Sequence, residues 1–217
     1  PRSTLDGTFD GAPLTGIYDP KTFQPREAVG FFLGRARKTF ILALEQELAR
    51  SAPVKALVLV HAETSTGALQ PLEDVGTLCR AHDALFIVDA VTSLGGIPVE
   101  VDTWGIDACY SGTQKCLSCP PGLAPLTVSP RGMGAIRQRR APCHSWYLDL
   151  SLIADYWNDQ SRAYHHTAPI SMLYGLREAL RLVHEEGLPA RAARHQVTSD
   201  ALMAGLRALG LSPLPPP

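Results

Sequence analysis

The apolar run Ala84-Leu85-Phe86-Ile87-Val88, followed directly by Asp89, gives the clearest indication of the fold. The run is short and contains branched side chains, which is typical of a buried strand. Apolar residues at helical spacing precede it over residues 72–79, and a similar apolar run occupies residues 56–60. The order strand, helix, strand predicts an α/β fold with a mostly parallel sheet covered by helices on both faces.

Further elements extend this pattern toward both ends of the chain. A helix is expected over residues 39–50, and short strands are expected over 108–110 and 123–128. A long amphipathic helix should then present Leu173, Leu176, Leu180 and Val183 on one face before it stops at Gly187-Leu188-Pro189. A last helix over about residues 192–209 should bury Val197, Leu202, Leu206 and Leu209 and end at Gly210 as its cap.

These patterns divide the chain into three parts. Residues 1–38 mix Gly, Pro, Thr and Asp without a sustained period, so they predict no element. Residues 39–190 form the expected large-domain core. Residues 191–217 contain the last helix and lead toward a C-terminal small domain that we expect to be missing from this chain.

Composition limits the classes of partner. The 217 residues are 45% hydrophobic and carry a net charge of -1 from 20 basic and 21 acidic side chains. This balance gives no electrostatic reason to expect a nucleic-acid or membrane partner. The five cysteines are odd in number and unevenly spaced, so a disulfide framework is not expected and a reducing, cytoplasmic location is. No run approaches the roughly 20 apolar residues that span a bilayer.

Asp89 and Lys115 are the first candidate site residues, because each follows a predicted strand. Open α/β sheets bind ligands at the carboxyl ends of their strands. Taken singly, Asp89 is equally well explained as a turn or helix-capping residue, and Lys115 as a solvated surface lysine. Together they match the needs of a pyridoxal-5′-phosphate (PLP) enzyme, in which a lysine forms a Schiff base and a carboxylate keeps the pyridine nitrogen protonated.

Four blocks carry a resemblance to a known family. Residues 88–96 (Val-Asp-Ala-Val-Thr-Ser-Leu-Gly-Gly) and 110–122 (Tyr-Ser-Gly-Thr-Gln-Lys-Cys-Leu-Ser-Cys-Pro-Pro-Gly) closely resemble the alanine–glyoxylate, serine–glyoxylate and serine–pyruvate aminotransferases. These enzymes form the class V branch of PLP fold type I. Residues 61–67 (His-Ala-Glu-Thr-Ser-Thr-Gly) and 164–169 (Tyr-His-His-Thr-Ala-Pro) resemble two further segments of the same family, in the same order.

The resemblance implies a transaminase that moves an amino group from alanine or serine to glyoxylate or pyruvate. Lys115 would hold PLP as an internal aldimine and, once released by the substrate, would move the proton between the substrate Cα and the cofactor. Asp89 would stabilise the pyridinium. Thr64 would contact the cofactor through its hydroxyl.

The same resemblance implies a homodimer. Gln114, next to the lysine, would bind the PLP phosphate together with Tyr164 and Thr167 of the neighbouring subunit. The partners would otherwise be small amino acids and 2-oxo acids.

The chain also departs from the family pattern. A small-residue phosphate loop and an aromatic ring that stacks on the cofactor should precede residue 56, and neither is found in residues 1–38. The arginine that binds the substrate carboxylate belongs to the C-terminal domain. A truncated, non-catalytic PLP-fold remnant or interaction module therefore stays open as a second hypothesis.

Two further enzyme classes and a metal site are less well supported. A cysteine desulfurase of the same fold type is disfavoured because residues 114–117 and 164–169 resemble the aminotransferases. A nucleotide-binding oxidoreductase would need Gly-x-Gly-x-x-Gly at a helix start, which the sequence lacks. His165-His166 has no further ligand at metal-binding spacing, and Cys116-x-x-Cys119 lies inside the lysine loop, so no metal site is expected and local packing is favoured for the cysteines.

Overall fold

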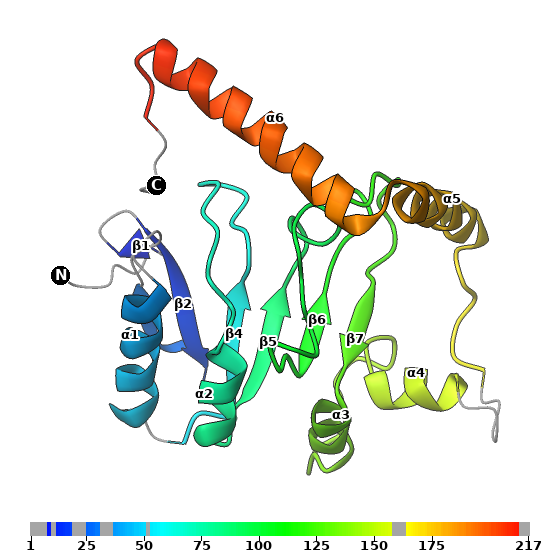
Figure 1. The fold of residues 1–217 in the computed structure, drawn as a ribbon. Helices are drawn as coiled ribbons and strands as arrows, with labels where there is room; N and C mark the ends of the chain where they lie inside the picture. The colour runs from blue at the N-terminus through cyan, green and yellow to red at the C-terminus, as the bar shows by residue number, and fades with distance from the viewer. Residues whose placement is uncertain are drawn as a thin grey trace.

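The computed structural model describes residues 8–9, 12–18, 25–30, 37–50, 53–157 and 164–212, and a central sheet organises them (Figure 1). Within these residues the sheet has seven strands in the order β1-β2-β4-β5-β6-β7, with β3 paired to β2. The strands are β1 (Thr8–Phe9), β2 (Ala12–Tyr18), β3 (Pro25–Gly30), β4 (Ala56–Val60), β5 (Leu85–Asp89), β6 (Ala108–Tyr110) and β7 (Leu126–Val128).

The three central strands are parallel and end at one edge of the sheet. β4 pairs with β5 in a register that sets Val60 beside Asp89, and β5 pairs with β6 so that Asp89 lies beside Tyr110. The flanking strands β2 and β7 run antiparallel to their neighbours. The described sheet is therefore mixed, with the predicted parallel arrangement at its centre.

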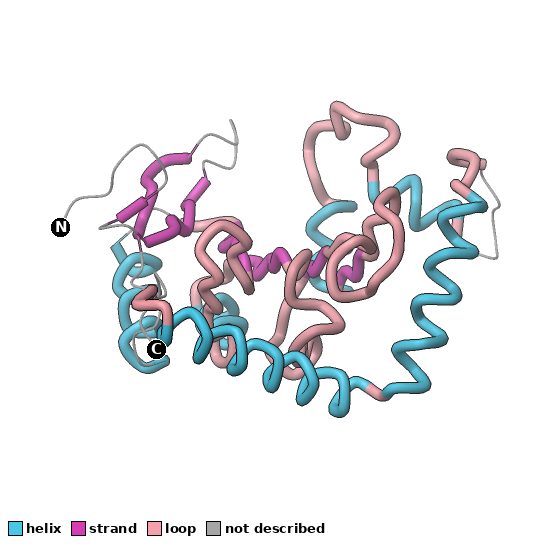
Figure 2. The backbone as a smooth tube through the Cα atoms, turned by 90° about the horizontal axis from the view of Figure 1, so that it is seen from above, coloured by secondary structure: helices cyan, strands magenta, loops and turns pink. Residues whose placement is uncertain are grey.

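Helices surround this sheet at its faces and around its upper edge. They are α1 (Arg37–Arg50), α2 (Val75–Ala81), α3 (Pro130–Arg137), α4 (Leu150–Tyr156), α5 (Ile170–Glu186) and α6 (Leu188–Ala208). Helix α6 passes across the edge where the parallel strands end, which is the upper edge in Figure 1. Figure 2 looks down on that edge and shows α6 running alongside the loops that leave it.

The hydrophobic core lies on one face of the parallel strands. Alternate residues of β4 and β5 are buried, among them Leu59, Phe86 and Val88, and they pack against Leu44 of α1 and Val75 of α2. Burial at every second residue reflects the two-residue period of a strand. The intervening residues of β4 and β5 are only half-buried, so the described helices do not bury the second face to the same extent as the first.

The N-terminal segment contains strands that the sequence does not predict. Between residues 8 and 30 the structure has β1, β2 and β3, and β2 pairs with β3 from Leu14 opposite Gly30 to Tyr18 opposite Pro25. Antiparallel pairing joins these strands to their neighbours in the chain, and Ile17 of β2 pairs with Leu57 of the distant strand β4. The local sequence has no regular alternation of apolar and polar residues from which the strands could be predicted.

The last strand is shorter than predicted. The expectation covered residues 123–128, whereas β7 contains only Leu126–Val128. Pro125 lacks a backbone N–H and cannot continue the ladder as a donor, although its carbonyl still accepts the Ser111 N–H at 2.9 Å.

Helix α5 ends at Glu186, directly before Gly187-Leu188-Pro189, as predicted, but α6 begins at Leu188, earlier than the expected start at about residue 192. Gly187 has a φ of 81° and Pro189 lies in the first turn of α6. The predicted burial of α6 is wrong for the described residues: Val197, Leu202 and Leu209 are 68%, 59% and 78% exposed, and Leu206 is half-buried. Gly210 follows the end of α6 with a φ of 79°, which agrees with its predicted capping role.

On α5 the predicted apolar face is only partly covered. Val183 is buried and Leu176 is half-buried, but Leu173 and Leu180 are 43% and 47% exposed. The periodicity correctly indicates a helix, yet it does not show what covers its apolar face. Among the described helices, none combines the length and the apolar character needed to cross a membrane.

Candidate active site

Asp89 lies at the carboxyl end of β5, where two donors orient its carboxylate. Oδ1 accepts the Val91 backbone N–H at 2.9 Å, and Oδ2 accepts the Tyr110 hydroxyl at 2.7 Å. The hydrogen bond from the Val91 N–H is the one expected if Asp89 is a structural turn residue. The second contact comes from the neighbouring strand β6, so the carboxylate is held in place from two sides.

Lys115 lies on a tight turn that follows β6. The turn is closed by the Ser118 N–H donating to the Lys115 carbonyl at 2.9 Å and by the Cys119 N–H donating to the Thr113 carbonyl at 3.0 Å. Thr113 is fully buried and its hydroxyl donates to the Pro120 carbonyl at 2.8 Å. The base of the turn is therefore rigidly connected, while the Lys115 side chain itself is exposed at the sheet edge.

Gln114 precedes the lysine and is also exposed. Its side chain folds back over Gly112, because a Cβ added to Gly112 would lie 2.6 Å from the Gln114 Oε1 atom. A glycine at position 112 therefore leaves room for the Gln114 amide beside the lysine turn.

The loop after β4 joins the same edge. Thr64 lies on its exposed turn. The loop is tied to the segment after Asp89, because the Thr92 hydroxyl donates to the Ala62 carbonyl and the His61 Nδ1 atom lies 3.0 Å from the Ser93 Oγ atom. The structure thus brings Thr64, Asp89, Gln114 and Lys115 to adjoining loops of one edge.

His61 is a structural residue of this edge that the sequence pattern does not single out. It is buried, its ring meets Trp104 edge-on at 5.6 Å, and its backbone N–H donates to the Asp89 carbonyl at 2.9 Å. Burial lowers the pKa of His61 to about 4, against an opposing effect of Glu73. The ring is therefore neutral near pH 7. In the sequence, His61 stands directly after a predicted strand and at the start of the block 61–67, but neither feature predicts its burial.

Tyr164 and Thr167 lie elsewhere. Both are exposed, and the Tyr164 hydroxyl is 2.6 Å from the Thr167 Oγ1 atom. Figure 1 shows their segment on the outer side of the molecule beyond β7, apart from the loops that carry Asp89 and Lys115. Within one chain the structure does not bring these two residues to the candidate site.

The paired histidines and cysteines of the sequence make only local contacts. His165 and His166 lie with their Nδ1 atoms 2.6 Å apart, and His165 stacks on Trp146. Cys116 and Cys119 are both free thiols, and the Cys116 Sγ atom is 3.4 Å from the Thr92 carbonyl. In the part of the chain that the structure describes, no group of three or more His, Cys, Asp or Glu could hold a metal ion.

An apolar cavity of about 450 Å³ lies between the loops that follow β5 and β6 on one side and α5 with the start of α6 on the other. Its lining offers few hydrogen-bonding groups, so it does not suit a phosphorylated ligand. The lining residues are Leu94, Gly95, Leu117, Pro125, Leu176, Leu180, Val183, His184, Gly187 and Leu188.

Comparison with known proteins connects this site to a family. The profile described as "Aminotransferase class-V" matches residues 38–214. The (S)-ureidoglycine–glyoxylate transaminase of Bacillus subtilis is 47% identical over 175 residues, which cover 72% of this chain and 42% of that protein. The alanine–glyoxylate aminotransferase of Callithrix jacchus is 44% identical over 170 residues, which cover 77% and 41%.

Solved structures agree with these relatives. The alanine–glyoxylate aminotransferase from Nostoc sp. has a TM-score of 0.76 and 49% sequence identity, covering 79% of this chain and 45% of that one. The pyridoxamine–pyruvate aminotransferase from Mesorhizobium loti has a TM-score of 0.70 and 35% identity, covering 79% and 43%. The chain spans about two fifths of the length of the curated relatives that it matches. With the profile matched over most of its residues, the chain belongs to the class-V aminotransferases.

Proposed function

We propose that the protein is a PLP-dependent aminotransferase that transfers an amino group from a small donor, alanine or serine, to glyoxylate or pyruvate. The observation that carries the proposal is the convergence of Asp89 and Lys115 on one sheet edge. Asp89 is the last residue of β5 and Lys115 lies on the turn after β6, and these two strands are adjacent and parallel. Class-V aminotransferases use PLP, and this edge offers the two groups that PLP chemistry needs.

The geometry of Asp89 fits the ring nitrogen of the cofactor. An ionised carboxylate has about four acceptor positions. The Val91 N–H and the Tyr110 hydroxyl occupy one on each oxygen, which leaves acceptor capacity for a protonated pyridine nitrogen. When bound, PLP withdraws electrons from the substrate Cα and so makes its proton easier to remove.

Each candidate residue then has a distinct task. Asp89 would keep the proton on the ring nitrogen by its negative charge. Lys115 would bind the cofactor covalently and, as a free amine after substrate binding, would carry the proton at the substrate Cα. Gln114 would donate to the phosphate, and Thr64 would contact the cofactor from the loop after β4.

Tyr164 and Thr167 are proposed to act across a homodimer. Their hydroxyls are adjacent, exposed and remote from Lys115 in the same chain. Each hydroxyl carries one proton, so in this contact one donates to the other. Both hydroxyls become free to donate if a phosphate of the other subunit replaces this mutual hydrogen bond. The proposed enzyme therefore needs two subunits to complete each site.

The names of the relatives favour one of the two proposed amino-group acceptors. The B. subtilis and C. jacchus proteins are both named as glyoxylate transaminases, although their donors differ. We therefore place glyoxylate ahead of pyruvate as the acceptor. Alanine, serine and ureidoglycine are the donors to compare.

The experiment is a visible absorption spectrum of the purified protein with PLP, followed by borohydride reduction and peptide mapping. We expect a yellow band and a reduced cofactor label on Lys115, both lost in Lys115→Ala. Lys55→Ala is the matched control, because Lys55 is exposed but precedes β4 at the opposite edge of the sheet. A band that survives in Lys115→Ala, or a label on another lysine, would refute the assignment.

A further inference from the structure

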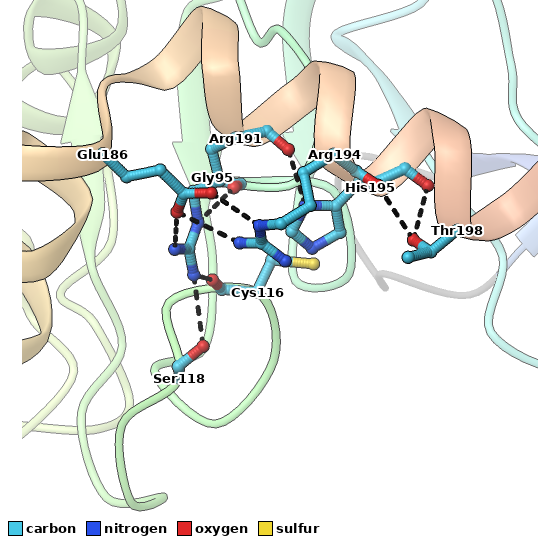
Figure 3. Close-up of polar contacts among 8 residues, drawn as sticks. All are labelled: Gly95, Cys116, Ser118, Glu186, Arg191, Arg194, His195 and Thr198. Atoms are coloured by element: carbon cyan, nitrogen blue, oxygen red, sulfur yellow. Dashed lines mark hydrogen bonds and ion pairs between the residues drawn. The ribbon is translucent and has the colours of Figure 1, made fainter.

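Arg191, in the first turn of α6, is a buried arginine whose exposed fraction is only 7%. Arginine is rarely buried this completely unless its donors are paired. Its Nε atom donates to the Gly95 carbonyl at 2.9 Å, and its Nη2 atom donates to the Cys116 carbonyl and, at 3.1 Å, to the Ser118 hydroxyl (Figure 3). The remaining Nη1 atom forms an ion pair with Glu186 at 2.6 Å.

The acceptors belong to the two loops of the candidate site. Gly95 lies on the loop that begins at Asp89, and Cys116 directly follows Lys115. Gly95 and Ser118 have φ angles of 84° and 59°, so both loops are in a left-handed conformation where the arginine binds them. This conformation is unfavourable for a serine and needs support from its surroundings.

The two loops also lie directly against each other at the residues next to those that Arg191 binds. A Cβ added to Gly95 would lie 3.1 Å from the Leu117 Cδ2 atom, and one added to Gly96 would lie 2.7 Å from the Cys116 Sγ atom. The planar fork of an arginine carries donors on three nitrogens and so reaches well-separated acceptors on both loops at once, whereas a lysine carries all its donors on a single nitrogen.

Glu186 holds the arginine from the other side. It is the last residue of α5 and also receives Arg194 at 2.6 Å from Nε and 3.0 Å from Nη2. Hydrogen bonds from Arg194 first, and then from Arg191, lower the pKa of Glu186 to about 2, so the carboxylate is ionised near pH 7. Arg191 therefore joins the α5–α6 corner to both loops.

We propose that Arg191 is a positioning residue that holds the Lys115 turn against the Asp89 loop. The Lys115 amine and the Asp89 carboxylate can then contact the same cofactor in the required geometry. The inference rests on the proposed function. It assigns to α6 a role in cofactor binding through backbone carbonyls, with no contact between Arg191 and the cofactor itself.

The test compares Arg191→Met and Arg191→Lys with Arg194→Gln in the purified protein. Arg194 is the matched control, because it shares Glu186 with Arg191 while its guanidinium bonds to that carboxylate rather than to either loop. The measurements are the dissociation constant for PLP from the visible band, the circular dichroism of the bound cofactor, and the melting temperature. We expect both Arg191 variants to bind PLP at least about tenfold more weakly with altered cofactor dichroism, and Arg194→Gln to resemble the parent.

The dichroism separates positioning from stability, because it reports the orientation of the bound ring. If the Arg191 variants melt earlier but bind PLP with parental affinity and dichroism, the proposal is wrong. If Arg191→Met fails to fold, Arg191→Lys and Ser118→Ala decide by the same measurements. Absence of any lysine-dependent band in the parent protein would instead refute the proposed function, so the two failures are distinguishable.

Discussion

At the scale of single residues, Asp89 has a structural role in a turn and a proposed chemical role, and the sequence does not decide between them. Its Oδ1 atom closes the turn to Val91, as a purely structural aspartate would, while Oδ2 is oriented by the Tyr110 hydroxyl. A turn that fixes a carboxylate also limits its rotation, so the structural role is compatible with the proposed chemical one. The charge and the turn contact can be separated by substitution.

Asp89→Asn keeps an oxygen for the Val91 N–H but removes the charge. We expect kcat/KM for transamination to fall by about 10²–10³-fold, because the neutral amide no longer stabilises a protonated ring nitrogen. Tyr110→Phe removes one orienting hydrogen bond and should lower kcat/KM by less than about tenfold. Equal losses in the two variants would contradict a role for the charge.

His61 should make stability depend on pH. Its folded pKa of about 4 lies below the ordinary value of 6.5, so protons bind the unfolded state more readily between these limits. The free energy of unfolding should therefore decrease as pH falls from 6.5 toward 4, and should gain nothing from His61 above pH 6.5. Between pH 6.5 and 5, where carboxylates contribute little, we expect a loss on the order of 1–2 kcal/mol.

The measurement is urea denaturation at several pH values for the parent and His61→Asn. The variant should be less stable at pH 7 but should lose less stability than the parent on acidification to pH 5. A variant with the same pH dependence as the parent would show that another group is responsible.

The sequence marks those site residues that follow predictable strands, and it misses those defined by tertiary contact. Asp89 and Lys115 stand directly after or close to apolar runs, so their common edge follows from the strand order. Arg191 carries no comparable signal, because its acceptors are carbonyls 75 and 96 residues away in the chain. His61 is similar, since its partner Ser93 is 32 residues away.

At the scale of elements, a buried carboxylate joins the strand ends opposite the candidate site. Asp107 is 2% exposed and accepts the Phe86 N–H at 3.0 Å, the Ser129 hydroxyl at 2.9 Å and the Arg131 Nη1 atom at 2.6 Å. These contacts connect the start of β5, the segment before β6 and the first turn of α3. The pairing compensates for the cost of burying the charge.

Asp107→Ala should therefore destabilise the fold strongly. It would leave the Phe86 N–H and the Arg131 guanidinium without this partner, and we expect a loss of about 3 kcal/mol in the free energy of unfolding. Urea denaturation measures it, with Arg181→Gln as control. Arg181 pairs with Glu178 and Glu185 on the exposed surface of α5, so its removal should change stability little. A comparable loss in both variants would contradict a special role for Asp107.

Elements with strong local patterns are predicted well, and those that depend on their neighbours are not. The apolar runs identify β4 and β5, and helical spacing identifies α1, α2 and α5. Strands β1 to β3 are not predicted, because antiparallel pairing with other strands stabilises them rather than a local sequence pattern. For α6 the period indicates a helix, but burial requires a covering surface, and the described chain provides one chiefly at Arg191.

At the scale of the whole molecule, large aromatic side chains are exposed around the segment that carries Tyr164. Trp146, Tyr147 and Trp157 are 57%, 56% and 81% exposed, and Tyr164 is 70% exposed. A concentration of this kind is typical of a protein interface. It accords with the proposed homodimer, in which this segment reaches the neighbouring site.

Mixing two inactive variants tests whether each active site is formed by residues of two subunits. Lys115→Ala removes the proposed cofactor lysine, and a double variant with Tyr164→Phe and Thr167→Ala removes the proposed partner hydroxyls. In a hybrid dimer one site carries both defects and the other carries none. Random mixing should therefore restore about a quarter of the parental site count, measured as transaminase activity.

If mixing restores nothing although hybrids are shown to form, the hydroxyls act within their own subunit or not at all. Size-exclusion chromatography with light scattering, on subunits that carry tags of different mass, provides the check that hybrids exist. Each variant incubated alone is the control, and neither should recover activity with time.

The contrast between the two halves of α6 has a consequence for amide exchange. Around Arg191 the helix is anchored to the loops, whereas from residue 196 to its end almost every side chain is exposed. In an isolated chain, backbone amides in that outer half should take up deuterium nearly as fast as those of a free helix, while the first turns resist. Slow deuterium uptake along the outer half would then identify the turns of α6 that another protein surface covers.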